Sequence, residues 1–207
     1  MNRIFFTADL HFGHRNVLRH CPKRPFATQN DTEAHDNWLT DLWNTKIDRR
    51  DTVYILGDLT FYDRKKARAL IERLNGRKHL ITGNHDCAAK LPTDCFETIS
   101  PLIDIVIKPV DVPYLRENLF VTMCHYPLLS WNKKSYGAVM LHGHCHGNMD
   151  TYNAESGELR FDVGVDGELA QGKDWILGLE TIYTAIVEKT GGESPVNYAS
   201  RNYRKRE

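Results

Sequence analysis

Three short apolar runs alternate with two amphipathic segments in the first 86 residues, and this order constrains the fold more than any other feature. The runs at residues 4–8, 53–56 and 79–82 are rich in aromatic and β-branched side chains, which favour strands. The segments at 32–47 and 64–74 carry apolar residues at three- and four-residue spacing, which is typical of helices. Because strands that alternate with helices are joined by helical crossovers, the pattern predicts a parallel sheet.

The second half of the chain has more strand and turn signals than helix signals. Further strands are predicted at residues 103–110, 119–123, 138–141 and 159–165, with a turn at 153–157. A helix is expected over 177–189, because its apolar residues share one face. The residues that follow are polar and basic, so we expect a single domain over 1–192 and a disordered basic tail over 193–207.

The charge balance and the cysteines limit the cellular roles that the chain can have. Lys and Arg together number 27, as do Asp and Glu, so no net charge draws the chain to nucleic acid or to membranes. No apolar run approaches 18 residues, which predicts no membrane span. The five cysteines show no C-x-x-C spacing, and this favours a reducing compartment. We therefore expect a cytoplasmic protein without a dedicated nucleic-acid-binding domain.

Most of the predicted strands end in side chains that bind metals or transfer protons. Asp9 and His11 follow the first run, Asp58 follows the second, Asn84, His85 and Asp86 follow the third, His125 follows 119–123, and His144 and His146 follow 138–141. In open α/β sheets, ligands bind beyond the carboxyl ends of the strands. The separate clusters are therefore expected to form one cluster in space.

The chemistry of these side chains favours transition metals. Two carboxylates, one amide oxygen and four imidazoles form a mixed oxygen and nitrogen ligand set, which suits Mn²⁺, Fe²⁺, Co²⁺, Ni²⁺ or Zn²⁺. Seven ligands are too many for one tetrahedral ion, whereas two ions that share a carboxylate would use them all. A histidine-rich patch can also be a solvated loop that binds metal weakly, and the residue types alone leave that alternative open.

The ordered motifs resemble those of one enzyme family. They are D-x-H (Asp9, His11), G-D (Gly57, Asp58), G-N-H-D (83–86), a single histidine (His125) and G-H-x-H (143–146). Single motifs of this kind are weak signals, but the five in this order are specific. The set resembles the calcineurin-like metallophosphoesterase family, in particular its small bacterial and phage members. This resemblance implies an αββα sandwich, in which helices flank two mixed β-sheets.

The resemblance also implies a role for each motif residue. Asp9, His11 and His146 would hold one divalent metal ion, Asn84, His125 and His144 would hold a second, and Asp58 would bridge the two. Mn²⁺ is the first choice for both ions. A metal-activated hydroxide would attack phosphorus, while His85 would act as general acid and Asp86 would orient it. The implied function is a phosphoesterase that hydrolyses phosphate mono- or diesters, with nucleotides among the candidate substrates.

Some interpretations stay open at the level of sequence. His14, Arg15 and Asn16 follow the first motif and could contact the substrate phosphate, or they could only stabilise a loop. The functional alternatives are a catalytically weak metal-binding scaffold of the same fold and a nucleotide- or RNA-directed phosphodiesterase. The intact motif with His85 favours the enzyme over the scaffold. The oligomeric state cannot be predicted from these residues.

Overall fold

The computed structural model describes residues 2–25, 31–171 and 174–204, and the nine strands within them form two mixed sheets. The first sheet has the order β4-β3-β2-β1-β9, and its strands are β1 (Ile4–Thr7), β2 (Thr52–Ile55), β3 (Arg77–Ile81), β4 (Thr98–Ser100) and β9 (Leu177–Gly178). Strands β1 to β4 pair in parallel, and β9 is antiparallel to β1. The parallel arrangement predicted for the first three strands is confirmed.

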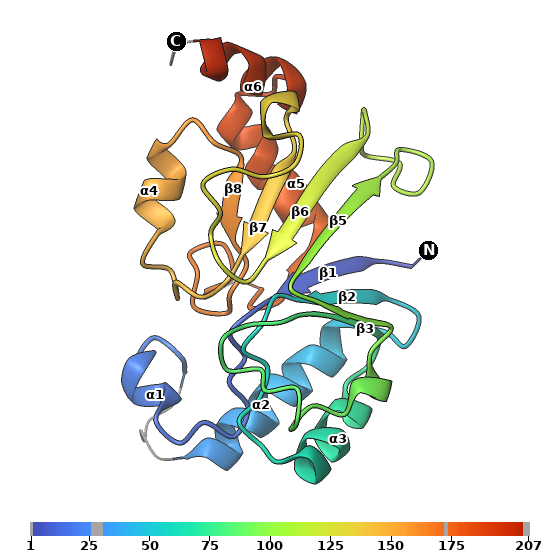
Figure 1. Cartoon of the computed structure of the whole chain (residues 1–207), viewed down its shortest axis with the longest axis vertical. Coiled ribbons are helices and arrows are strands. Elements are labelled where there is room, and N and C mark those ends of the chain that lie inside the picture. The colour runs from blue at the N-terminus through green and yellow to red at the C-terminus, as the bar shows by residue number, and fades with distance from the viewer. Residues whose placement is uncertain (1, 26–30, 172–173, 205–207) are drawn as a thin grey trace.

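Two helices cross over between the parallel strands and cover one face of the first sheet. They are α2 (Thr32–Lys46) and α3 (Arg64–Arg73), and they lie on the side of the first sheet that faces away from the second sheet (Figure 1). The carboxylates of Asp31 and Asp63 accept backbone N–H groups of the first turns, which explains where the helices begin. Trp43 is fully buried between α2 and the sheet, and its indole N–H donates to Asn75 O at 2.8 Å.

The second sheet has the order β5-β6-β7-β8. Its strands are β5 (Leu102–Ile107), β6 (Leu119–Cys124), β7 (Val139–His142) and β8 (Arg160–Asp162). Strands β5 and β6 are antiparallel, whereas β6, β7 and β8 pair in parallel. Two mixed sheets flanked by helices are the fold expected from the motifs.

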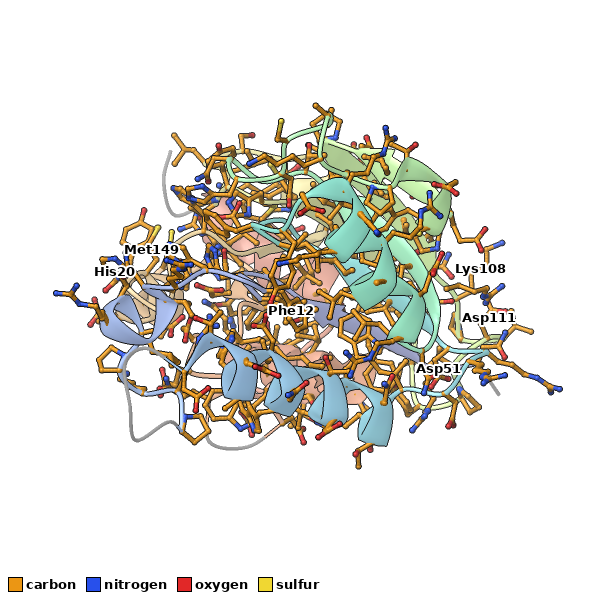
Figure 2. All side chains as sticks on the ribbon, turned by 90° about the horizontal axis from the view of Figure 1, so that it is seen from below. Phe12, His20, Asp51, Lys108, Asp111 and Met149 are labelled. Carbon is orange, nitrogen blue, oxygen red and sulfur yellow. The ribbon has the colours of Figure 1, made fainter. Side chains whose placement is uncertain are left out.

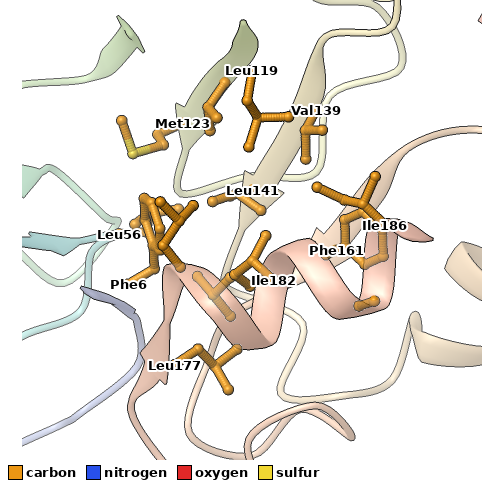
Figure 3. Packing of buried hydrophobic residues seen from close by; sticks show 14 of the residues in the cluster. Phe6, Leu56, Leu119, Met123, Val139, Leu141, Phe161, Leu177, Ile182 and Ile186 are labelled. Carbon is orange, nitrogen blue, oxygen red and sulfur yellow. The ribbon is translucent and has the colours of Figure 1, made fainter. Parts of the chain in front are cut away.

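The largest apolar cluster joins the two sheets. Phe6 of β1 and Leu56, which follows β2, meet Met123 and Leu141 from the second sheet, and α5 (Leu179–Thr190) adds residues such as Ile182 (Figure 3). A β-bridge also links the sheets, because Ala8 after β1 pairs with Gly164 after β8. The carboxyl end of β1 is thereby fixed beside the second sheet, and this contact brings the loops of both sheets together.

Several short elements differ from the sequence prediction. Helix α4 (Asp150–Glu155) lies where a turn was expected, and the helix expected from residue 177 begins two residues later because Leu177–Gly178 pairs with β1 as β9. The short elements β4, α1 (Val17–His20) and the 3-10 turns η1 (Thr93–Cys95) and η2 (Lys134–Tyr136) complete the chain. In the described part of the chain, no helix has both the length and the apolar character required to cross a bilayer.

The expectation of a disordered tail is wrong for residues 195–204, which form α6 (Pro195–Arg204). This helix packs against η2, and the backbone of Pro195 lies against Gly137. Ala199 is buried in the contact. Tertiary packing therefore orders a segment whose composition alone indicates disorder. The last three residues of the expected tail lie outside the described residues.

Candidate metal centre

The expected ligands lie together in the loops that follow β1, β2, β3, β6 and β7. Among the described residues, three groups of donor atoms could each hold an ion, with all atoms of a group within 4.8 Å of one another, and two of them consist of expected ligands alone. The first group is Asp9, His11 and His146, and the second is Asp9, Asp58 and His125. The structure thus brings together the residues that the strand-end rule expects to converge, and their role as ligands stays a prediction.

The carboxylate of Asp58 lies between the two halves of the centre. Its Oδ2 atom is 3.8 Å from His11 Nε2 and 3.6 Å from His125 Nε2. The side chain is almost completely buried, and its Oδ1 accepts the backbone N–H of His85 at 2.9 Å. Asp58 is thus placed where one carboxylate can contact two ions.

The remaining expected ligands converge on Asn84. Its Oδ1 atom lies 2.9 Å from His125 Nε2 and 3.0 Å from His144 Nδ1. His125 Nδ1 is 2.8 Å from Leu56 O, and a carbonyl can only accept, so Nδ1 carries the proton. In the neutral imidazole, Nε2 and the amide oxygen are then two acceptors that face each other at hydrogen-bonding distance. A cation between them would turn this repulsive contact into a favourable one.

A buried carboxylate oxygen of Asp9 also favours a bound cation. Asp9 is fully buried, and its Oδ1 accepts no hydrogen bond from the described residues, although it lies 4.0 Å from His146 Nε2. Its Oδ2 accepts the backbone N–H of His144 at 2.9 Å. A buried carboxylate oxygen without a partner is costly, and a divalent ion would satisfy it. The residues present therefore fit a metal centre.

The backbone at the centre is strained. Of the seven non-glycine residues with positive φ in the described chain, five are expected ligands: Asp9, His11, Asp58, His144 and His146. Such conformations are uncommon outside glycine and cluster at functional sites. The loops also approach closely, because a Cβ at Gly83 would collide with the carboxylate and backbone of Asp58. The glycine of G-N-H-D is thus required by the close packing of two loops.

The electrostatics of the protein without metal follow from burial. Burial raises the pKa of Asp9 well above its usual value, and burial lowers the pKa of His11 to about 2. For His146, burial opposes protonation, but hydrogen bonds to Asp166 and Cys21 and the charge of Asp9 raise the pKa to about 11. Metal ligands must be deprotonated at the ligating atom, so an ion bound here would compete with protons for the Asp9 carboxylate and for His146 Nε2.

His85 and Asp86 differ in their placement. The His85 side chain is 47% exposed, and its Nε2 lies 4.0 Å from Asp58 Oδ2, so the ring stands at the mouth of the centre. The Asp86 carboxylate instead accepts the backbone N–H groups of Asp58, Leu59 and Gly83 at 2.8–3.0 Å. Asp86 therefore fixes the loop that carries Asp58, and the role expected for it in orienting the His85 ring stays a prediction.

The three candidate substrate-binding residues differ in their surroundings. The His14 ring stacks on Phe61 at 4.3 Å between centroids, and it is 5.6 Å from the His11 ring. Arg15 and Asn16 are exposed. Their contact with substrate stays a prediction.

Three residues that contact the centre were not predicted from the sequence. Cys21 Sγ lies 3.4 Å from His146 Nδ1, Asp166 Oδ2 lies 2.7 Å from the same nitrogen, and Arg24 pairs with Asp166. Asp166 follows β8 by a few residues, so the strand-end rule could have identified it. Cys21 and Arg24 lie in an irregular segment whose spacing carries no signal.

Comparison with known proteins agrees with this geometry. A family model described as calcineurin-like phosphoesterase matches residues 2–201. The gene 66 protein of Mycobacterium phage L5 is 28% identical over 170 residues, which are 72% of this chain and 80% of the phage protein. The gene 66 protein of Mycobacterium phage D29 is 30% identical over 165 residues, covering 70% of this chain and 79% of that protein.

A solved structure of a protein of unknown function from Aquifex aeolicus shares the fold. Its TM-score is 0.63 at 19% identity, and the match covers 89% of this chain and all of that one. The family match over nearly the whole chain and the convergent ligand motifs point to one conclusion. The chain belongs to the calcineurin-like phosphoesterase family.

Proposed function

We propose that the protein is a hydrolase that cleaves phosphate mono- or diesters at two divalent transition-metal ions. The observation that carries the proposal is the convergence of donor atoms from five loops around the buried carboxylate of Asp58. Asp9, His11 and His146 would hold one ion, and Asn84, His125 and His144 would hold the other. The mixed oxygen and nitrogen donors favour Mn²⁺ first, and they also suit Fe²⁺, Co²⁺, Ni²⁺ or Zn²⁺.

The chain's own residues supply position and proton transfer. When bound, the two ions would provide a water activated for attack and would neutralise charge on the phosphate oxygens. His85 is half-exposed and is anchored by its backbone N–H to Asp58 Oδ1, so its ring can meet a substrate that enters from solvent. Protonated His85 would donate to the leaving oxygen as general acid. Tyr126, 44% exposed beside His125 and His144, borders the opposite part of the centre.

The test is hydrolysis of bis-p-nitrophenyl phosphate beside p-nitrophenyl phosphate. Protein stripped with EDTA is assayed after addition of Mn²⁺, Ni²⁺, Mg²⁺ or Zn²⁺, and the ratio of diester to monoester cleavage narrows the substrate class. We expect His85→Ala to lose most turnover, by about 10²–10⁴-fold, while it keeps its metal content. His79→Ala is the matched control, because His79 lies on β3 and stacks on Tyr54 away from the centre.

The outcome separates the enzyme from a silent scaffold. Unchanged turnover in His85→Ala would contradict the general-acid role. Two bound ions without cleavage of either ester, or of a set of nucleotides and cyclic phosphates, would contradict the hydrolase and support the scaffold. Asp58→Asn adds a test of the dinuclear centre, because loss of only one ion in this variant would argue against bridging.

A further inference from the structure

A buried arginine connects three parts of the metal centre. Arg24 is 2% exposed and forms a bidentate pair with Asp166, in which Nε donates to Oδ1 at 2.9 Å and Nη2 donates to Oδ2 at 2.6 Å. The same guanidinium donates to the backbone carbonyls of Asp9 at 2.7 Å and Leu10 at 3.2 Å. One side chain therefore holds the backbone of the D-x-H motif and a carboxylate 142 residues further along the chain.

The partner of this arginine holds an expected ligand. Asp166 Oδ2 lies 2.7 Å from His146 Nδ1, and a carboxylate accepts, so Nδ1 of His146 donates. The other ring nitrogen, Nε2, then faces His11 Nε2 at 3.2 Å and Asp9 Oδ1 at 4.0 Å. A histidine that donates one N–H to a carboxylate and turns its other nitrogen inward has the arrangement common to metal-binding histidines.

The network continues to the segment after His11. Arg24 Nη1 lies 2.8 Å from His35 Nε2, and because arginine only donates, His35 Nε2 accepts and its Nδ1 donates to Asp36 Oδ1 at 2.9 Å. Asp36 Oδ2 accepts the backbone N–H of Gly13 at 2.8 Å and the hydroxyl of Tyr62 at 2.6 Å. The positive-φ loop from Asp9 to Gly13 is thus fixed from α2 at its far end and by Arg24 at its near end.

We propose that Arg24 and Asp166 are positioning residues that set the geometry of one metal site, the site of Asp9, His11 and His146, and not that of its neighbour. The inference rests on the proposed function, since it requires His146 to be a ligand. The selectivity follows from the contacts: Arg24 and Asp166 touch the backbone of Asp9 and the ring of His146, whereas His125 is fixed by Leu56 O instead.

Another function of the same residues is a third metal site. Cys21, His146 and Asp166 place a sulfur, a nitrogen and an oxygen close enough to hold an ion. The guanidinium of Arg24 lies 2.6 Å from Asp166 Oδ2, and this fixed positive charge opposes a further cation on that oxygen. The geometry therefore favours a supporting role, and the number of bound ions distinguishes the two.

Calorimetric titration of EDTA-stripped protein with Mn²⁺ tests the proposal. The variants are Arg24→Lys, which keeps the charge and loses the bidentate fork, and Asp166→Asn, which keeps the shape. We expect about 10–100-fold weaker binding of one ion in both variants, with the affinity of the other ion unchanged. The control is Arg3→Lys, which disrupts the two hydrogen bonds that Arg3 Nε and Nη2 donate to Asp51 Oδ2. Asp51 lies at the edge of the molecule opposite to His20 and Met149 (Figure 2).

Each outcome supports or overturns the proposal. The second ion is an internal reference, because a variant that merely loosens the fold weakens both ions, and that result would overturn selective positioning. Unchanged affinities for both ions would overturn it as well, and a third ion bound by the native protein would assign the residues to a separate site. If the native protein binds neither Mn²⁺ nor any of Fe²⁺, Co²⁺, Ni²⁺ and Zn²⁺ in the same titration, the proposed function itself fails. If Arg24→Lys does not fold, the titration of Asp166→Asn alone tests the proposal.

Discussion

Replacing Asp9 by asparagine is expected to stabilise the protein without metal and to remove part of its response to metal. Asp9 is completely buried and its Oδ1 accepts no hydrogen bond from the described residues. Burial raises its pKa well above the usual value, the charge of His146 opposes this, and the carboxylates of Asp162 and Asp58 reinforce it. Without a cation, the folded chain must therefore bury an uncompensated charge or take up a proton.

The magnitude follows from one unsatisfied buried atom. Asparagine has the same shape, and its oxygen can still accept the N–H of His144, now 2.9 Å from Asp9 Oδ2. Relief of one unpaired buried polar group amounts to about 1–3 kcal/mol. For a chain of this length each kcal/mol shifts Tm by roughly 2–4 °C, so Tm in EDTA should rise by about 2–12 °C. Each ion at 100 times its Kd should raise the free energy of unfolding of the native protein by about 2.7 kcal/mol. In the variant, this increase should be absent for one of the two ions.

Thermal unfolding in EDTA and in excess Mn²⁺, each at several pH values, measures both effects. Because the folded-state pKa of Asp9 is raised, its contribution is fully favourable below the unfolded value of 3.8. This contribution to stability is lost as pH rises through the folded-state pKa. The Tm of metal-free native protein should therefore fall more with increasing pH than the Tm of Asp9→Asn.

Asp51→Asn is the matched control, because the pKa of Asp51 is lowered in the folded protein whereas that of Asp9 is raised. Burial opposes ionisation of Asp51, but the hydrogen bonds from Arg3 lower its pKa, so its stabilising contribution is present above the unfolded pKa and lost as pH falls. The control should therefore have a lower Tm at neutral pH with or without metal. A lower Tm for Asp9→Asn in EDTA, or an undiminished rise in Tm on adding Mn²⁺, would refute the assignment of Asp9 as a strained ligand.

Two further predictions concern the loops and the remote end of α5. Gly83→Ala should weaken both ions, because its Cβ would collide with Asp58, whereas Gly178→Ala, with its nearest contact at 3.7 Å, should leave Mn²⁺ titrations unchanged. Equal titration curves for the two variants would contradict the close packing of the loops. Burial lowers the pKa of Lys189 to about 8, so the unfolded chain binds more protons between that value and 10.5, and stability from this group should rise with pH across the window. Lys189→Gln should lack this rise in urea unfolding at pH 7.5 and 10, and an identical rise in the variant would show that another group is responsible.

The convergence of the expected ligands was predictable from the sequence because it depends on a local rule. A short apolar run followed by an aspartate or histidine marks the end of a strand, and parallel strands bring such ends to one edge. The same rule does not predict the backbone conformation that follows each strand, since the residue types at positions 9–11 do not indicate a positive φ. The Arg24–Asp166 pair was not predictable, because it joins segments whose proximity exists only once β1 and β8 are bridged through Ala8 and Gly164.

The short elements were missed for a related reason. The two residues of β9 are too few to show a period, and they form a strand only because β1 offers an edge. Helix α6 has the composition of a tail, and it is ordered through its contact with η2. Such elements are determined by their neighbours in space, so single-sequence patterns assign them poorly.

The strain at the centre explains why the loops depend on one another. A left-handed conformation costs roughly 1–2 kcal/mol for a residue with a side chain, so the surroundings must impose it on the expected ligands. Backbone hydrogen bonds between loops do so: the N–H of His11 donates to Asp58 O at 2.9 Å, and the N–H of Gly143 donates to His125 O at 3.0 Å. Each loop is thus held by another loop and not by its own strand alone. The donor atoms are consequently positioned before an ion binds. The strained backbone that preorganises the site lowers the stability of the fold.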